Sequence, residues 1–265
     1  MPLAAKAGTA FVGAQVGPSL LYEPALAEVF NTRSRYHDEA ARAVNFFALL
    51  GLNRVEALVS SDAFGKDVMA GLLPAMQAAQ VDLVAQASLD NRVADITQQL
   101  AQIKQAQPQV VILVSNAKAA AAFVRAAKAE SFHPRFVTLS NTSSASFVTD
   151  LGDAAEGVIV TQVVPTPHSA RLRAVAQFRS AGAEAGANAP PLSHASLQGW
   201  LTVRFIAELI RRAGPQATRE RIVAAAAPSA SFDLGDFMLN YSAASRQGSR
   251  LVELTVIGRN GRFLY

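Results

Sequence analysis

Three short polar stretches follow apolar runs of strand length and carry side chains that could bind a solute. They are residues 60–64 (SSDAF), 115–117 (SNA) and 140–143 (SNTS). Hydroxyl and amide groups, together with backbone N–H groups, can fix the orientation of a small polar ligand, and Phe64 adds an apolar face. Ligands of open parallel sheets bind outside the carboxyl ends of the strands. The candidate ligand-binding residues are Ser60, Ser61, Asp62, Phe64, Asn116, Ser140 and Asn141.

The same polar residues have a second interpretation as helix caps. Ser, Thr, Asp and Asn are the preferred residues at helix N-termini, because their side-chain oxygens accept hydrogen bonds from free backbone N–H groups. Ser61 or Asp62 would cap one helix, and Ser143 would cap another. One such loop alone favours capping, whereas three at strand ends favour a binding site. Both interpretations stay open at the level of sequence.

Motifs for other chemistries are absent or incomplete. Gly65–Lys66 lacks the earlier glycine and the following Ser or Thr of a phosphate-binding loop, and VGAQVG does not match the dinucleotide fingerprint. The sequence has no G-x-S-x-G nucleophile elbow. Its four histidines show no paired metal-ligand spacing, and the acids in HDE at 37–39 suit the first turn of a helix. We therefore expect no catalytic residues, no metal and no cofactor.

Composition narrows the class of protein further. Of 265 residues, 51% are hydrophobic and 17% are charged, so the chain can bury a core. The formal net charge of +4 is scattered, which argues against a nucleic-acid partner. The absence of cysteine excludes disulfides, thiol chemistry and cysteine-based metal sites. No apolar run reaches the roughly 18 residues of a membrane helix, and residues 1–17 lack the pattern of an export signal.

Alternating strand and helix patterns predict a doubly wound α/β fold. Helices are expected to alternate with these strands, with a kink or early end at Pro74 and a capping box formed by Asp95 and Gln98. The expected strands are residues 9–13, 54–60, 81–87, 109–115, 135–140 and 156–164, and the expected helices are 38–51, the segment from Lys66, 95–106 and 117–130.

The pattern changes after Pro165 and Pro167. Helices are expected at 170–185, 195–213 and 218–226 without strands between them, followed by closing strands at 236–242 and 250–258. The middle helix is apolar around much of its circumference and therefore needs a sheet to cover. The preceding strands already have their own helices. Bare helix faces in this region predict self-association.

Several local stretches resemble the type I periplasmic binding proteins, and more narrowly the branched-chain amino acid and amide group of ABC-transporter substrate-binding proteins. The resemblance spans residues 11–263 in family order. The stretches that carry it are VFNTRSRYHDEA, SSDAFGKD, GDAAEGVIVTQVVP, SLQGW, FDLGDF and QGSRLVELTVIGRNGRF.

This resemblance implies two α/β lobes with doubly wound parallel sheets and a ligand held in the cleft between them. Residues 33–165 and 249–265 would form a complete second lobe, and residues 1–32 and 166–248 a remnant of the first. Several strand–helix units that precede residue 9 in family members have no counterpart here. The chain would then be a fragment, a degenerate descendant, or a protein that borrows a partner's sheet.

The resemblance also assigns roles to three candidate residues. Phe64 lies where members place an aromatic side chain against the ligand, and Asn116 where another side chain faces it. Ser140 lies where amino-acid binders carry an acid that pairs with the ligand's ammonium group. An unpaired ammonium in a desolvated cleft is costly, so a free α-amino acid is disfavoured unless Asp62 substitutes for that acid.

We therefore interpret the sequence as a non-enzymatic, periplasmic solute-binding protein of an ABC transporter. Its partners would be a small-molecule ligand (an amino acid, amide or small carboxylate) and a membrane permease, with homo-oligomers formed through the exposed helices of the first lobe. Three alternatives remain open: a ligand-sensing receptor or regulatory domain, an enzyme of doubly wound fold that uses Asp62, and a remnant without a competent site.

Overall fold

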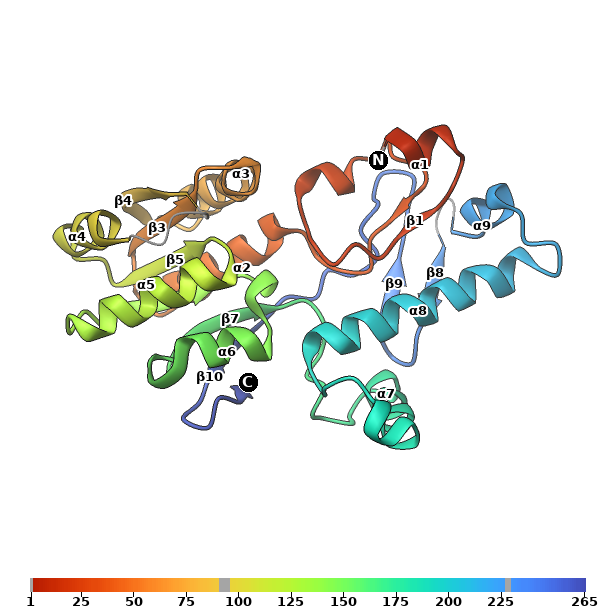
Figure 1. Cartoon of the computed structure of the whole chain (residues 1–265). Helices are drawn as coiled ribbons and strands as arrows, with labels where there is room; N and C mark the ends of the chain where they lie inside the picture. The colour runs from red at the N-terminus through yellow and green to blue at the C-terminus, as the bar shows by residue number, and fades with distance from the viewer. Residues whose placement is uncertain (1, 91–95, 227–229) are drawn as a thin grey trace. The chain divides into compact units, whose positions relative to one another are not determined.

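The computed structural model describes residues 2–90, 96–226 and 230–265. The chain divides into two compact units (Figure 1). The first unit contains Met1–Arg35 and Val163–Leu251, and the second contains Tyr36–Gln162 and Val252–Tyr265. The chain therefore passes between the units after Arg35, Gln162 and Leu251.

The second unit is built on a seven-stranded sheet with the order β11-β10-β7-β6-β5-β3-β4. The pairs from β4 through β7 are parallel, and β10 is antiparallel to both β7 and β11. A sheet of this kind, with helices between its parallel strands, confirms the expected doubly wound α/β architecture. The strands are β3 (Arg54–Ser60), β4 (Asp82–Leu89), β5 (Val110–Val114), β6 (Arg135–Thr138), β7 (Ile159–Gln162), β10 (Glu253–Ile257) and β11 (Phe263–Leu264).

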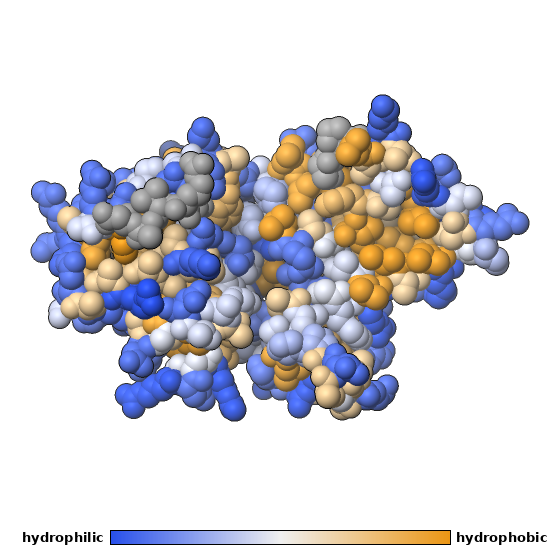
Figure 2. Space-filling view, viewed as in Figure 1, coloured by the Kyte–Doolittle hydropathy of each residue, from blue (hydrophilic) through white to orange (hydrophobic). Residues whose placement is uncertain are grey.

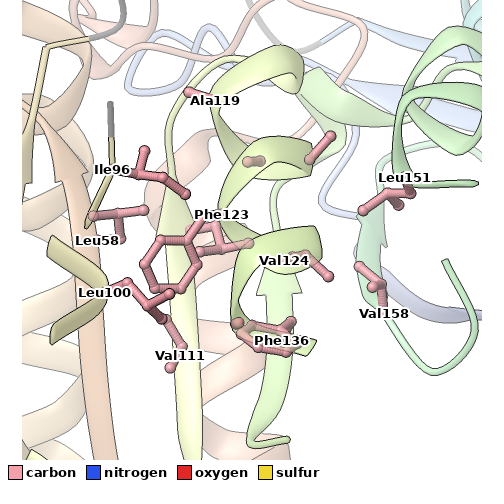
Figure 3. Close-up of a cluster of buried hydrophobic side chains, with 14 of the residues drawn as sticks. Leu58, Ile96, Leu100, Val111, Ala119, Phe123, Val124, Phe136, Leu151 and Val158 are labelled. Atoms are coloured by element: carbon pink, nitrogen blue, oxygen red, sulfur yellow. The ribbon is translucent and has the colours of Figure 1, made fainter. Parts of the chain in front are cut away.

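Helices cover both faces of this sheet, which is why β5 (VVILV) is apolar and buried at every position. On one face, α2 and α3 pack over alternate residues of β3, including Val55 and Ala57. On the other face, Phe123 of α5 packs in a cluster with Leu58 and Val111 (Figure 3). The helices are α2 (Tyr36–Leu49), α3 (Ala63–Ala78), α4 (Thr97–Ala106), α5 (Ala117–Ala129) and α6 (Ala145–Leu151), with short 3₁₀ turns η2 (Ser140–Thr142) and η3 (Gly152–Ala154).

Two sequence expectations about these helices need comment. Pro74 does not end α3, which continues to Ala78. Proline removes one N–H donor and crowds the carbonyl one turn earlier, and the burial of Leu72 and Met76 on either side of it offsets this cost. Asp95, expected in a capping box, lies outside the described residues. The bounds of α6 were not predicted, although Ser143 was expected to cap a helix at this place.

The first unit contains short strands around one long helix, α8. Phe205 of α8 stacks on Tyr241 at a centroid distance of 5.4 Å and meets Phe232 edge-on at 4.9 Å. The pairs β1–β2 (parallel) and β8–β9 (antiparallel) form separate two-stranded sheets. The elements are α1 (Pro2–Lys6), β1 (Phe11–Val12), η1 (Ser19–Tyr22), β2 (Val29–Phe30), α7 (Arg173–Ala185), η4 (Gly186–Asn188), α8 (His194–Ala213), α9 (Arg219–Ala225), β8 (Ser231–Asp233) and β9 (Met238–Asn240).

One side of α8 is apolar and exposed. Val203, Ile206 and Ile210 follow helical spacing and are 64%, 37% and 46% exposed. Figure 2 shows a broad hydrophobic area in this part of the first unit, near β1 and α8 of Figure 1. The self-association expected from bare helix faces stays a prediction, which light scattering would test.

Neither a membrane span nor a metal cluster is found in the part of the chain that the structure describes. None of its helices is both long and apolar enough to cross a bilayer. Within residues 2–90, 96–226 and 230–265, no group of three or more His, Asp or Glu side chains is placed to hold a metal ion.

Candidate functional site

The three polar loops named from the sequence lie at one edge of the sheet of the second unit. They follow β3, β5 and β6, which are neighbours in the order β6-β5-β3, so their carboxyl ends lie side by side. The Asn141 side-chain N–H donates to the carbonyl of Ser115 at 3.0 Å and joins the third loop to the second. The structure thus brings all the candidate residues to one unit and one sheet edge.

In the loop after β3, the polar groups form hydrogen bonds with one another. The Ser60 hydroxyl donates to Asp62 Oδ1 at 2.8 Å, and the same oxygen accepts the Gly65 N–H at 3.1 Å. Asp62 is therefore the N-cap of α3. A Cβ atom on Gly65 would lie 1.8 Å from the carbonyl oxygen of Ser60, so this turn requires glycine.

Phe64 and Ser61 occupy the more accessible side of this loop. The Phe64 ring is half-buried and meets the buried Tyr36 ring edge-on, with centroids 5.1 Å apart. Ser61 is exposed, and its backbone N–H donates to the carbonyl of Leu89, the last residue of β4. The Phe64 ring therefore packs against Tyr36, and the backbone of Ser61 is hydrogen-bonded to β4.

Asn116 and Ser144 cap the helices that begin at the other two loops. Asn116 is exposed, and its Oδ1 accepts the Ala119 N–H at 2.9 Å. Ser144, rather than the expected Ser143, caps α6 through the Phe147 N–H. The Ser143 hydroxyl is buried and donates instead to Gln162 Oε1 at 2.7 Å, which takes it away from the helix end. The capping interpretation thus holds for Asp62 and Asn116 and was wrong for Ser143.

Ser140 is held by a buried acid that the sequence did not single out for the site. Glu39, in the first turn of α2, is fully buried. Its Oε2 accepts the Ser140 N–H at 2.8 Å, and its Oε1 accepts the Ser140 hydroxyl at 2.9 Å. The Thr161 hydroxyl of β7 also donates to Oε2. The only sequence signal was the HDE triplet, which was attributed to acids in a first helical turn.

His37 of the same triplet has a packing role. Its Nε2 lies 2.7 Å from the carbonyl oxygen of Asp67 in α3 and 3.5 Å from Asp67 Oδ1. The ring lies so close to Gly71 that a Cβ atom there would be 2.3 Å from His37 Cγ. His37 therefore contributes to the packing of α2 against α3. Among the described residues, His37 and the two acids that follow it are not placed to hold a metal ion.

The Ser140 contacts set the polarity of the site. Because the Ser140 hydroxyl donates its proton to Glu39, any further hydrogen bond that its oxygen makes must be one that it accepts. A hydroxyl in that state accepts hydrogen bonds from N–H or O–H groups. The exposed amides of Asn116 and Asn141 and the Phe64 ring complete a surface of hydrogen-bonding groups beside one aromatic face.

Together, the fold and these loops define a class: α/β proteins with polar loops at the carboxyl ends of neighbouring parallel strands. The sequence profile of the periplasmic binding protein family matches residues 1–262. The chain belongs to this family. No curated protein matches the chain.

Solved structures similar to this chain carry the same fold. A substrate-binding periplasmic protein from Ralstonia solanacearum is 28% identical with a TM-score of 0.87, and the match covers 99% of this chain and 74% of that one. A possible leucine/isoleucine/valine-binding protein from Rhodopirellula baltica SH 1 is 27% identical with a TM-score of 0.87, covering 100% and 73%. A branched-chain amino acid ABC transporter protein from Thermus thermophilus, with bound valine, is 18% identical with a TM-score of 0.83, covering 99% and 72%.

Proposed function

We propose that this chain is an extracytoplasmic solute-binding protein of an ABC transporter for branched-chain amino acids, amides or related small organic acids. The observation that carries the proposal is the clustering of three polar loops at one sheet edge in a member of the periplasmic binding protein family. The similarity to a Thermus thermophilus protein with bound valine supports the size and chemical class of the ligand. The permease would recognise the ligand-bound form.

The polarity of Ser140 narrows the ligand within this class. Ser140 lies where the resemblance implies an acid in amino-acid binders, and its hydroxyl already donates to the buried Glu39, so it can contact a ligand only as an acceptor. An acceptor at this place favours a ligand that offers N–H groups, such as a primary amide or an ammonium. Asp62 is a weaker partner for such a group, because its Oδ1 already accepts two hydrogen bonds in the loop.

A thermal-unfolding screen tests the proposal. The panel pairs branched-chain amino acids and their amides with carboxylates of the same carbon skeleton that lack nitrogen. A ligand present at about 100 times its dissociation constant adds about 2.7 kcal/mol of stability. We expect a stabilising shift with the N–H-bearing compounds and a smaller shift with their nitrogen-free analogues. A protein that no compound in the panel stabilises would contradict the proposal.

Two variants connect the screen to the site. Ser140→Ala removes one acceptor and is expected to weaken binding about fivefold, the effect of losing one hydrogen bond of about 1 kcal/mol. Ser146→Ala is the matched control, because Ser146 is an exposed serine of α6 in the same unit and is outside the candidate set. Equal binding by the wild type and Ser140→Ala would remove Ser140 from the site.

A further inference from the structure

A cavity lies within the first unit, between α7 and α8. Its volume is about 270 Å³. It is lined by Phe178, Arg179 and Gly182 of α7 and by Trp200 of α8. The chain between the two helices contributes Pro190 and Leu192 to the lining. Figure 1 shows α7 beside the N-terminal half of α8. None of the candidate solute-binding residues belongs to this unit.

The aromatic walls of this cavity are held in place by contacts within the unit. Phe178 and Trp200 meet edge-to-face with centroids 5.9 Å apart. The Arg204 guanidinium lies 4.9 Å from the centroid of the Trp200 ring and donates to Gln177, which fixes that ring from another side. Phe178 is buried and Trp200 is half-buried. A ring fixed before binding loses little side-chain entropy when a ligand packs against it.

Arg179 adds a positive charge to an otherwise apolar lining. One of its terminal N–H groups donates to the carbonyl of His168 at 2.9 Å, which anchors the guanidinium at the cavity. A guanidinium has five N–H donors arranged to match a carboxylate, and this bond uses one of them. Apolar and aromatic walls with a single fixed cation suit a ligand with an apolar body and one negative end.

We propose that this cavity binds a small monocarboxylate with an aromatic or branched aliphatic body. The carboxylate would pair with Arg179, and the body would pack against the adjoining rings of Phe178 and Trp200. A cavity of about 150 Å³ accommodates benzene, so about 270 Å³ provides room for a phenyl ring with a short acidic arm. The inference is independent of the proposed function, because the residues it uses lie outside the candidate edge of the second unit.

Intrinsic fluorescence provides a direct readout, since Trp200 is the only tryptophan of the chain. Phenylacetate and 4-methylpentanoate are the probes, and their neutral primary amides are the comparison. We expect a saturable change in Trp200 emission with millimolar half-saturation, and binding of the amides weaker by about fivefold because Arg179 is exposed to solvent. Titration of free N-acetyltryptophanamide corrects for absorption by the probes.

A filled-cavity variant separates this site from general effects. A Cβ atom on Gly182 would meet no atom within 4 Å, so Gly182→Leu extends a side chain into the cavity without a clash at its base. Gly199→Leu is the matched control, because Gly199 is also a helical glycine with open space at Cβ and does not line the cavity. Both variants replace a helical glycine with a better helix former and should fold.

The proposal requires that Gly182→Leu abolish the fluorescence response and that Gly199→Leu preserve it. Arg179→Gln should reduce the affinity for the carboxylates to that for the amides. The absence of a saturable response, or a response that survives in Gly182→Leu, would overturn the proposal. A response that disappears in Ser140→Ala would assign the signal to the other site and overturn it as well. Equal affinity for carboxylates and amides would overturn the assigned ligand class.

Discussion

The second unit buries two glutamates completely, and their surroundings are opposite. Glu39 accepts hydrogen bonds from the Ser140 N–H, the Ser140 hydroxyl and the Thr161 hydroxyl. Glu56 lies in β3, and neither of its carboxyl oxygens has a hydrogen-bond partner among the described residues. Burial alone raises the pKa of Glu56 to about 7. The two acids share a sheet and differ in their position along its strands.

Position explains the difference. Glu39 reaches the sheet where β6 ends, and there the backbone N–H of Ser140 and nearby hydroxyls point out of the strand ladder. Glu56 is in the middle strand of a three-strand segment, opposite Ala85 of β4 and Val111 of β5. The backbone groups of β3 are hydrogen-bonded to the strands on either side, and the face of the sheet that carries the Glu56 side chain is covered by apolar residues. The end of a strand therefore offers hydrogen-bond donors to Glu39, whereas the interior of β3 offers none to the Glu56 side chain.

The largest effect is expected from Glu39→Ala. It removes the acceptor of the Ser140 N–H and of the Ser140 and Thr161 hydroxyls, at about 1–3 kcal/mol for each of these donors to a charged group, so we expect a loss of about 4 kcal/mol in the free energy of unfolding. Urea unfolding measures this loss. Glu130→Ala, which removes an exposed glutamate paired with Lys104, is the control and should change stability by about 1 kcal/mol or less. A Glu39→Ala loss as small as that of the control would show that the strand-end contacts contribute little.

Glu56 should make the free energy of unfolding depend on pH. Its carboxyl releases its proton near pH 4.5 in the unfolded chain and near pH 7 in the folded protein. Between these values the unfolded state binds fewer protons, so stability falls as pH rises and is lowest above about pH 7. The full difference is about 3 kcal/mol. Glu253, whose pKa is also raised by burial, contributes a change of the same sign.

The variant Glu56→Gln isolates this contribution. It replaces the ionisable group with a neutral one of the same shape, so we expect unchanged stability at pH 4 and a gain of about 3 kcal/mol at pH 8. Urea unfolding at both pH values, with the wild type in parallel, measures the gain. An equal change at both pH values would mean that Glu56 is solvated in the folded protein, and the contrast with Glu39 would then fail.

Thr161 tests whether the Glu39 contacts act as one network. Thr161→Val keeps the shape and removes one donor to the acid, so we expect a loss of about 2 kcal/mol in the free energy of unfolding. In a double-mutant cycle with Glu39→Ala, most of this loss should disappear, giving a coupling energy of at least about 1 kcal/mol. Additive losses would indicate that Thr161 stabilises the sheet by packing rather than through the acid.

Much of the scaffold of this site was predictable from the sequence. The pattern RVEALVS predicts a strand at 54–60, which matches β3, and the apolar run before Ser115 predicts the fully buried β5. The rule that ligands bind at strand ends located the three loops, because that rule depends only on the order of strands. Local patterns of period 2 and 3.6 carry this information.

The chemistry of the site was less predictable because its partners are far apart in sequence. Glu39 and Ser140 are separated by 101 residues, and Glu39 and Thr161 by 122. A single sequence shows an acid in a first helical turn and gives no sign of its partners. The cap of α6 was predicted wrongly for a similar reason, because the Ser143 hydroxyl donates to Gln162 of β7, a residue that is not its neighbour in sequence. Glu56 lies in a strand that is buried on both faces, so the sequence pattern does not show that its carboxyl group lacks hydrogen-bond partners among the described residues.

The smallest effect is expected at Asp62, an exposed carboxylate that completes the comparison. Its Oδ1 accepts the Gly65 N–H and the Ser60 hydroxyl, yet water can reach the acid when a partner is lost. Asp62→Ala should therefore lower the free energy of unfolding by about 1 kcal/mol, the usual effect of losing a helix N-cap. Asp62→Asn retains a capping oxygen and should stay within about 0.5 kcal/mol of the wild type. Urea unfolding of both variants measures these values. A loss at Asp62→Ala as large as that at Glu39→Ala would show that the whole strand-end edge, rather than the buried acid, stabilises the unit.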